Sequence, residues 1–212
     1  MVDDQAKNTR ESYDNVAAEY DKRISDELDH KPLERDLLDR FVANVPGRIC
    51  DLGCGPGHVT RYLRGQGADA FGIDLSPGMV EQAKLRNPGI TFEQGDMRAL
   101  DQEDDALGGI VLLYSIIHIP RDEVTDVLRE LRRVLKPGGH LLIGFHKGQE
   151  ILHQAELWGK AVNLDFYFFE PDEMAGYLRQ AGFEVTEIIE RPPYPEVEYQ
   201  SHRAYVWAHK SE

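Results

Sequence analysis

The stretch ICDLGCGPGHVT, residues 49–60, passes from apolar residues into a loop where glycine recurs at every second position. Gly53, Gly55 and Gly57 follow Asp51, a spacing that suits neither a regular helix nor a regular strand. The residues before the loop predict a short buried strand, and the following HVTRYLRG predicts a helix that ends at a glycine. We therefore expect a strand, a glycine-rich loop and a helix in direct succession.

Strands and helices alternate along most of the chain. Apolar residues recur every three or four positions in the helical segments, whereas the strand segments are short apolar runs between turn residues. The predicted helices are 9–24, 31–45, 58–65, 76–86, 121–135 and 170–182. The predicted strands are 48–53, 68–74, 90–96, 109–115, 140–146, 183–190 and 203–210. This alternation predicts an α/β fold, a Rossmann-like, doubly wound and mostly parallel sheet of seven strands with helices on both faces.

Two regions depart from this alternation. The last two predicted strands have no helix between them, and the connecting residues 191–202 are long enough to reverse the chain. One antiparallel strand is therefore expected at the C-terminal end of the sheet. Residues 147–170 carry a run of aromatic side chains and are predicted to be irregular.

The composition narrows the possible partners. The 212 residues are 41% hydrophobic and carry a formal charge of −14. This charge repels nucleic-acid phosphates and anionic lipid headgroups, so we expect neither nucleic acid nor membranes as partners. The polar N-terminus does not predict a signal peptide, and the longest apolar run, IVLLYSIIHI, is too short to span a bilayer. The two cysteines, Cys50 and Cys54, fit a cytoplasmic location; with only His58 nearby they predict no metal site.

The glycine loop has the chemistry of a nucleotide-like ligand site. Bare backbone N–H groups and a helix N-terminus approach a ligand closely, and Asp74 ends the next strand, where a carboxylate can accept hydrogen bonds from a ribose. Both a dinucleotide and an adenosyl sulfonium fit this description. The dinucleotide pattern requires a third glycine where this chain has His58. Asp51 would repel a pyrophosphate but suits the ammonium of an amino-acid tail, so the loop favours a zwitterionic ligand.

Five segments in order resemble the motifs of the class I S-adenosylmethionine-dependent methyltransferases. They are ICDLGCGPGHVTRYL, FGIDLSPGMVEQAK, FEQGDMRAL, GIVLLYSIIHI and LRRVLKPGGHLLIGF. The resemblance implies a single domain over residues 1–212. Its implied parts are lid helices (1–45), a cofactor-binding core (46–146), a substrate-cap segment (147–170), and a C-terminal helix and strand pair (171–212).

The resemblance also implies which residues bind S-adenosylmethionine and its product S-adenosylhomocysteine. They are Tyr13, Tyr20, Asp51, Gly53, Cys54, Gly55, Gly57, Asp74, Leu75, Met79, Asp96, Met97 and Tyr114. Asp74 would hold the ribose, Leu75 and Met79 would sandwich the adenine, and Asp96 and the Met97 backbone N–H would meet its ring edge. The glycines would hold the methionine end, Tyr114 would lie near the sulfonium, and the two N-terminal tyrosines would close over the site.

Two histidines follow strands at the expected ligand edge of the sheet. His118 and His146 titrate near neutrality in an ordinary environment, so either is a candidate for taking a proton from the acceptor. The residues expected to bind the acceptor are Tyr20, His118, His146, Phe166, Tyr167 and Phe168. Candidates for the far wall of the substrate site are Arg191, Tyr194, Tyr199 and Arg203.

The expected activity is methyl transfer to a small-molecule acceptor by in-line displacement, carried out by a monomer or a homodimer. The fourth strand ends in Leu-Tyr-Ser-Ile-Ile, not in the Asn/Asp-Pro-Pro-Tyr of family members that methylate DNA bases or glutamine amides. Three alternatives stay open at this point. They are a protein or RNA methyltransferase, a non-catalytic protein that binds S-adenosylmethionine, and a dinucleotide oxidoreductase.

Overall fold

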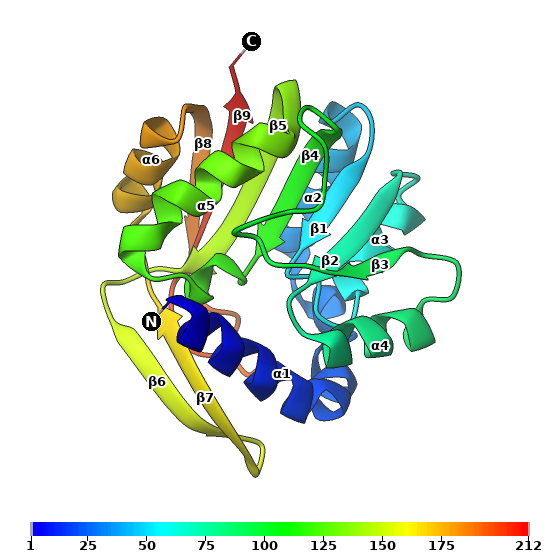
Figure 1. Ribbon diagram of the computed structural model, residues 1–212, viewed down its shortest axis with the longest axis vertical. Coiled ribbons are helices and arrows are strands. Elements are labelled where there is room, and N and C mark those ends of the chain that lie inside the picture. Colours follow the sequence, from blue (N-terminus) through cyan, green and yellow to red (C-terminus); the bar gives the residue numbers. More distant parts are fainter. Residues whose placement is uncertain (1, 212) are drawn as a thin grey trace.

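The computed structural model describes residues 2–211 and has a seven-stranded sheet at its centre (Figure 1). Its strands lie in the order β3-β2-β1-β4-β5-β9-β8, and β9 alone runs antiparallel to its neighbours. Their bounds are β1 (Ile49–Leu52), β2 (Ala70–Asp74), β3 (Phe92–Gln94), β4 (Leu107–Leu113), β5 (Leu135–His146), β8 (Phe183–Arg191) and β9 (Arg203–Lys210). The predicted fold class, including the single antiparallel strand, is confirmed.

Helices cover both faces of this sheet. In β4, Ile110 and Leu112 pack into the core beneath α5 (Arg121–Val134) and α6 (Pro171–Gln180). Val111, between them, packs on the opposite face with α2 (Pro32–Asn44) and α3 (His58–Gly65). A strand buried on both faces is what a central position in a parallel sheet requires. The remaining helix of the core, α4 (Pro77–Arg86), follows β2 and packs near β3.

Two elements lie beyond the carboxyl ends of the strands. The long helix α1 (Val2–Ile24) crosses this edge, and the hairpin of β6 (Ile151–Leu157) and β7 (Lys160–Tyr167) lies beside it (Figure 1). The prediction that residues 147–170 are irregular is therefore wrong. The two turn residues, Trp158 and Gly159, have φ values of +52° and +79°, as a tight hairpin turn requires. A tryptophan in place of the usual asparagine hides this turn in the sequence.

Hydrogen bonds hold α1 between the hairpin and α4. Asn15 Nδ2 donates to the Ala161 carbonyl at 2.9 Å, and the Asn163 backbone N–H donates to Ser12 Oγ at 2.8 Å. On the other side, the Gly78 backbone N–H donates to Asp14 Oδ1 at 2.9 Å. Thus α1 is a cover that is tied at both flanks.

The second N-terminal helix has a different position from the first. The buried side chains Leu37, Leu38 and Phe41 of α2 pack onto the sheet, and Phe41 contacts Trp207 with ring centroids 5.3 Å apart. This differs from the pair of lid helices expected for residues 1–45. Within residues 2–45, the cavity is bordered by α1, by the short 3₁₀ segment η1 (Glu27–His30) and by the following Lys31.

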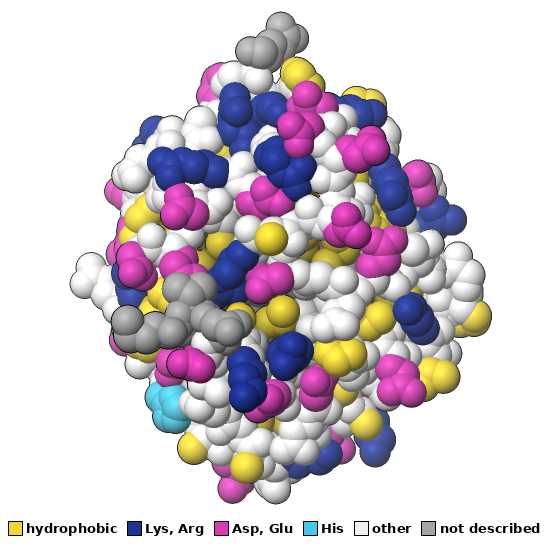
Figure 2. Space-filling view, in the orientation of Figure 1, with side chains coloured by type: hydrophobic (Ala, Val, Ile, Leu, Met, Phe, Trp, Pro, Cys, Tyr) yellow, Lys and Arg dark blue, Asp and Glu magenta, His cyan; other side chains and the backbone are white. Residues whose placement is uncertain are grey.

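Acidic and basic side chains are interspersed over the face seen in Figure 2. Within residues 2–211 no helix combines the length and apolar character needed to cross a bilayer.

Candidate active site

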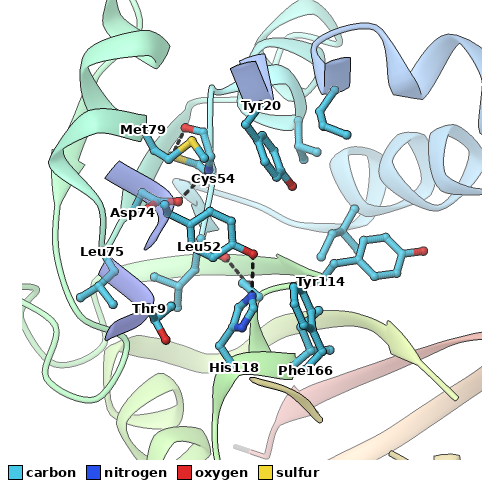
Figure 3. A pocket seen from close by; sticks show the side chains of 18 of the residues that line it. Thr9, Tyr20, Leu52, Cys54, Asp74, Leu75, Met79, Tyr114, His118 and Phe166 are labelled. Atoms are coloured by element: carbon cyan, nitrogen blue, oxygen red, sulfur yellow. Dashed lines mark hydrogen bonds between the residues drawn. The ribbon is translucent and has the colours of Figure 1, made fainter. Parts of the chain in front are cut away.

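A cavity of about 390 Å³ lies at the carboxyl edge of the sheet, beneath α1 and the β6–β7 hairpin. Its walls come from the ends of β1, β2, β4 and β5, from the hairpin, and from the loop between β8 and β9. Figure 3 shows Asp74, Leu75 and Met79 on one side, with Tyr114, His118 and Phe166 on the other. The cavity therefore joins the predicted cofactor residues to the predicted acceptor residues.

Gly53 lets the ends of two central strands come together. Its φ is +74°, and a Cβ at this position would lie 2.3 Å from Ser115 Cβ. Ser115 Oγ donates to the Leu52 carbonyl at 2.8 Å and so fastens the end of β4 to the end of β1. A side chain at residue 53 would break this junction, so the backbone of the loop stays open toward the cavity.

Asp74 organises the glycine loop from the neighbouring strand. Its Oδ2 accepts the Gly55 backbone N–H at 2.7 Å, and its Oδ1 accepts the Ser76 backbone N–H at 2.9 Å. Burial raises the pKa of this carboxyl to about 6. Each oxygen keeps a second lone pair, so Asp74 is able to accept further hydrogen bonds from a ligand in the cavity it borders.

Asp51 lies deeper at the end of β1. It is buried, and its Oδ2 accepts the Thr60 hydroxyl at 2.6 Å. Burial raises the pKa of its carboxyl to about 6, against the lowering effect of the Thr60 hydrogen bond. The residue borders the cavity beside Gly53 and Gly55.

Three apolar side chains and one carboxylate border the cavity after the ends of β2 and β3. Leu75, Met79, Asp96 and Met97 all border the cavity, and Met79 also packs against Val16 of α1. One oxygen of Asp96, Oδ1, accepts the Arg98 backbone N–H at 2.9 Å. This set combines flat apolar surface with a carboxylate, which suits a purine ring with an exocyclic amino group.

Tyr114 ends β4 in a strained backbone conformation. Its φ of +57° is rare for a residue with a Cβ. Its hydroxyl lies 2.6 Å from the Tyr205 hydroxyl and donates to Glu34 Oε1 at 3.3 Å. Strain of this kind is concentrated at functional sites, and here it turns the ring into the cavity wall.

His118, in the segment after β4, is hydrogen-bonded to both α1 and β7. Its Nδ1 donates to the Asp165 carbonyl at 3.0 Å, which leaves Nε2 as an acceptor for the Tyr13 hydroxyl at 2.7 Å. Burial lowers the pKa of this imidazole to about 4. His118 is therefore neutral at physiological pH, and both its ring nitrogens are already occupied, which differs from the free, near-neutral base that the sequence alone suggests.

His146, at the end of β5, borders the cavity and is hydrogen-bonded through one ring nitrogen. Its Nδ1 lies 2.7 Å from Ser201 Oγ, and no hydrogen bond of Nε2 is found among residues 2–211. The ring stacks on Phe168 with centroids 4.9 Å apart. Burial, followed by the charge of Arg203, lowers the pKa of His146 to about 3.

Four predicted site residues lie outside the cavity wall, namely Gly57, Tyr167 and the far-wall candidates Arg191 and Tyr194. Gly57 precedes α3 as its N-cap with a φ of +82°, and a Cβ there would lie 2.6 Å from the Phe92 ring, so this glycine serves packing. Tyr167 points away from Phe166 and Phe168 because successive side chains of an extended chain alternate, and it packs against the core near Arg121. The other predicted cofactor and acceptor residues all border the cavity.

Several wall residues were not predicted. Lys31, Glu198 and Trp158 border the cavity, as do Tyr199 and Arg203 among the far-wall candidates. Charged residues such as these usually belong to a solvated surface, and only the tertiary contacts of two distant segments bury them. Among residues 2–211 no group of three or more metal-ligating side chains is found.

The neutral state of His118 predicts a specific pH dependence. Its pKa is lowered on folding, so its stabilising contribution is present above about pH 6.5 and is lost as the pH falls toward 4. At pH 5 the loss is about 2 kcal/mol. The free energy of urea unfolding, measured from pH 8 to 4 for the wild type and for His118→Gln, tests this. Titration of Asp51 and Asp74 has the opposite effect on stability but acts on both proteins alike, so it cancels when one free energy is subtracted from the other. His153→Gln, in the exposed part of the hairpin, is the control; a difference that does not change with pH would contradict the prediction.

Comparisons with known proteins agree with this site. A family model described as a methyltransferase domain matches residues 49–139. A trans-aconitate 2-methyltransferase of Methylobacterium nodulans is 39% identical over 112 residues, which are 51% of this chain and 42% of that protein. A putative methyltransferase of Bacillus subtilis, YqeM, is 30% identical over 187 residues, which are 84% of this chain and 70% of the relative. The matches span about half the length of several curated relatives.

A solved structure extends the similarity to the whole fold. The 1,6-didemethyltoxoflavin-N1-methyltransferase of Burkholderia thailandensis, with bound 1,6-didemethyltoxoflavin and S-adenosylhomocysteine, aligns with a TM-score of 0.78 at 21% identity. The alignment covers 100% of this chain and 91% of the other. Together with the glycine loop at the end of β1 and the carboxylate that ends β2, these similarities show that the chain belongs to the class I S-adenosylmethionine-dependent methyltransferases.

Proposed function

We propose that this chain transfers a methyl group from S-adenosylmethionine, the cofactor of its family, to a small-molecule acceptor. The observation that carries the proposal is the continuity of one cavity from Asp74 and Asp96 to the aromatic side chains His146, Phe166 and Phe168. The carboxylates of the first part can accept hydrogen bonds from the ribose and the adenine of the cofactor. The second part is rich in aromatic side chains and is covered by α1 and the hairpin, which suits a compact acceptor better than a polymer.

The described residues fit the cofactor. The glycine loop presents backbone without Cβ atoms, and both oxygens of Asp74 are fixed by backbone N–H groups, so the carboxylate is oriented before a ligand arrives. In this proposal Gly53, Gly55 and Asp51 hold the amino-acid end, and Tyr114 lies near the reacting sulfur. Tyr13, Tyr20 and Cys54 complete the enclosure.

The cofactor, when bound, supplies a methyl group on a positively charged sulfur, which needs no further activation as an electrophile. The chain's own contribution is then to orient the acceptor and exclude water. The Tyr13–His118 and Asp165–His118 hydrogen bonds keep α1 closed against η2 (Ile116–His118) and the hairpin. Positioning is therefore expected to supply most of the rate.

A proton must leave when the acceptor is a hydroxyl or an acidic C–H group. We propose His146 as the first candidate to receive it, because its Nε2 is the ring nitrogen without a protein partner in the described structure. His118 would act by holding Tyr13. Burial lowers the pKa of His146 and makes it a weak base, so we expect proton removal by His146 to contribute less to the rate than positioning does.

The named relatives support a small acceptor. One is named for trans-aconitate, and the structural neighbour was solved with 1,6-didemethyltoxoflavin. We also propose that the protein acts in the cytoplasm as a monomer or homodimer and binds neither nucleic acid nor membranes. A protein or RNA methyltransferase and a non-catalytic binding protein are the competing functions.

The test uses the purified chain with methyl-labelled S-adenosylmethionine and a panel of small phenols, amines and carboxylates. We expect calorimetry to detect S-adenosylhomocysteine but not NAD, and label to appear on a small acceptor. Binding of S-adenosylhomocysteine without transfer to any small molecule, but with transfer to protein or RNA, would replace the proposal. Binding with no transfer at all would favour the non-catalytic alternative.

A further inference from the structure

The acceptor end of the cavity contains charged side chains that are almost completely buried. Lys31 and Arg203 are 4% and 2% exposed, and both border the cavity. They come from the start of α2 and the start of β9, segments far apart in the sequence. Burying such charges costs several kcal/mol per ion unless partners or a ligand compensate, so their presence requires an explanation.

The carboxylates that border this end of the cavity, Glu27 and Glu198, have both oxygens engaged. Glu34, which accepts from the Tyr114 hydroxyl but does not border the cavity, has a buried Oε2 without a partner in the described structure. Glu198 Oε1 accepts from Arg191 and from the Tyr194 backbone N–H at 2.8 Å, and Oε2 accepts from Arg191 at 3.1 Å. Glu198 Oε2 also lies 3.5 Å from both Lys31 Nζ and Arg203 Nη2. Glu27 is likewise engaged through both oxygens, with His58 at 3.0 Å and Lys31 at 2.8 Å.

The cations, in contrast, have hydrogen-bond donors left over. Arg203 Nη1 donates to the Ser201 carbonyl at 2.7 Å and also to Ser201 Oγ, and Nη2 donates to the Tyr199 carbonyl at 2.8 Å. Arg203 Nε is buried without a partner among residues 2–211. Lys31 has three N–H donors and makes one hydrogen bond within the described structure, to Glu27. Both cations that border this end of the cavity therefore keep N–H donors without an acceptor among residues 2–211.

The two cations lie at the aromatic part of the cavity. Lys31 Nζ is 5.2 Å and Arg203 Cζ 5.5 Å from the centre of the Tyr114 ring. Arg203 is paired with His146 across β5 and β9, and its charge contributes to the lowered pKa of that histidine. Positive charge thus reaches the space where the acceptor is proposed to lie, away from the carboxylates of the cofactor end.

We infer that the methyl acceptor carries a carboxylate, which binds between Lys31 and Arg203 against the face of Tyr114. The inference rests on the proposed function and narrows its substrate class. A carboxylate would take up the unused donors of both cations in charge-assisted hydrogen bonds. Phe168, stacked on His146, would contact the rest of the acceptor and favour one with a flat ring.

The test compares carboxylic acids with their neutral amides on the protein loaded with S-adenosylhomocysteine. Suitable pairs are 4-hydroxybenzoate and 4-hydroxybenzamide, cinnamate and cinnamamide, and phenylacetate and phenylacetamide, with benzylamine as a cationic probe. We expect at least one acid to bind about tenfold or more tightly than its amide, as charge-assisted hydrogen bonds imply. Lys31→Met and Arg203→Gln should bring this ratio close to one.

Matched variants separate the inference from general damage. Arg203→Lys should keep part of the preference for acids, because it retains the charge. Lys147→Met removes an exposed lysine at the same edge of the sheet, paired with Glu190, and should leave the ratio unchanged. Affinity for S-adenosylhomocysteine should stay within threefold of the wild type in Lys31→Met.

The inference is overturned if no acid binds better than its amide, if benzylamine binds better than the acids, or if the ratio survives both Lys31→Met and Arg203→Gln. Its failure is distinct from failure of the proposed function. Labelled methyl transfer to a neutral acceptor, without preference for acids, would leave the methyltransferase activity in place and remove only the carboxylate. Absence of S-adenosylhomocysteine binding would remove both.

Discussion

Replacing Asp74 with asparagine should weaken the binding of S-adenosylhomocysteine by about 30-fold to 100-fold. The carboxylate accepts two backbone N–H groups, from Gly55 and Ser76, and has lone pairs left for the ribose. Asparagine presents an amide NH₂ in place of one oxygen, so it must face a backbone N–H or the ligand with a donor. Losing a hydrogen bond to a charged group costs about 2–3 kcal/mol, which corresponds to this range of affinity.

Calorimetric titration at pH 7.5 measures the effect, and thermal unfolding separates it from damage to the fold. Asp69→Asn is the control, since this exposed carboxylate precedes β2 and pairs with the exposed Arg64 at 3.2 Å. Its affinity should match that of the wild type. A dissociation constant for Asp74→Asn within threefold of the wild type would show that Asp74 does not hold the ligand.

The wild-type protein should also lose affinity for S-adenosylhomocysteine as the pH falls below about 6. Burial raises the pKa of Asp74 to about 6, so the carboxyl becomes protonated in this range and loses part of its capacity to accept hydrogen bonds. The decrease should be smaller in Asp74→Asn, which has lost this carboxyl and keeps Asp51, whose pKa burial also raises to about 6. Titrations from pH 8 to 5 on both proteins test this, and a parallel decrease in both would assign the effect to another group.

The sheet could be predicted from the sequence because its signals are local. Short apolar runs such as the one in β4 and the helical periodicity of α5 depend on neighbouring residues only. The β6–β7 hairpin could not, because its turn places Trp158 at positive φ, and tryptophan is not a turn signal. Because these residues were predicted to be irregular, the alternation of side chains along β7 was missed as well. This alternation places Phe166 in the cavity wall and Tyr167 against the core.

The cofactor part of the site could likewise be predicted better than the acceptor part. Asp51, Gly53 and Gly55 lie within one short segment, and Asp74 lies at a fixed distance along the chain. The acceptor part depends on Lys31 and on a loop more than 150 residues further along, which meet only in the folded structure. No periodicity or spacing in the sequence indicates such a contact.

Replacing Arg191 with methionine should destabilise the fold by about 3–5 kcal/mol, because it leaves buried carboxylates without their main cation. Arg191 bonds Glu34 and Glu198, donates from Nε to the Tyr205 hydroxyl at 3.2 Å, and stacks over Tyr194 at 4.0 Å. The midpoint of thermal unfolding should fall by about 10 °C.

The control is Arg129→Met, which breaks an exposed pair with Asp126 on α5 and should change stability by less than about 0.5 kcal/mol. A second change, Glu34→Gln in the Arg191→Met background, should recover part of the lost stability, since Glu34 is the most deeply buried carboxylate of the cluster at 1% exposed. Recovery would show that uncompensated charge, and not lost packing, dominates the effect. If Arg191→Met alone lowered the free energy of unfolding by less than 1 kcal/mol, the prediction would be wrong. Tyr114, Tyr205 and the neighbouring cations would then compensate these carboxylates without Arg191, and the charge network would contribute little to the stability of the fold.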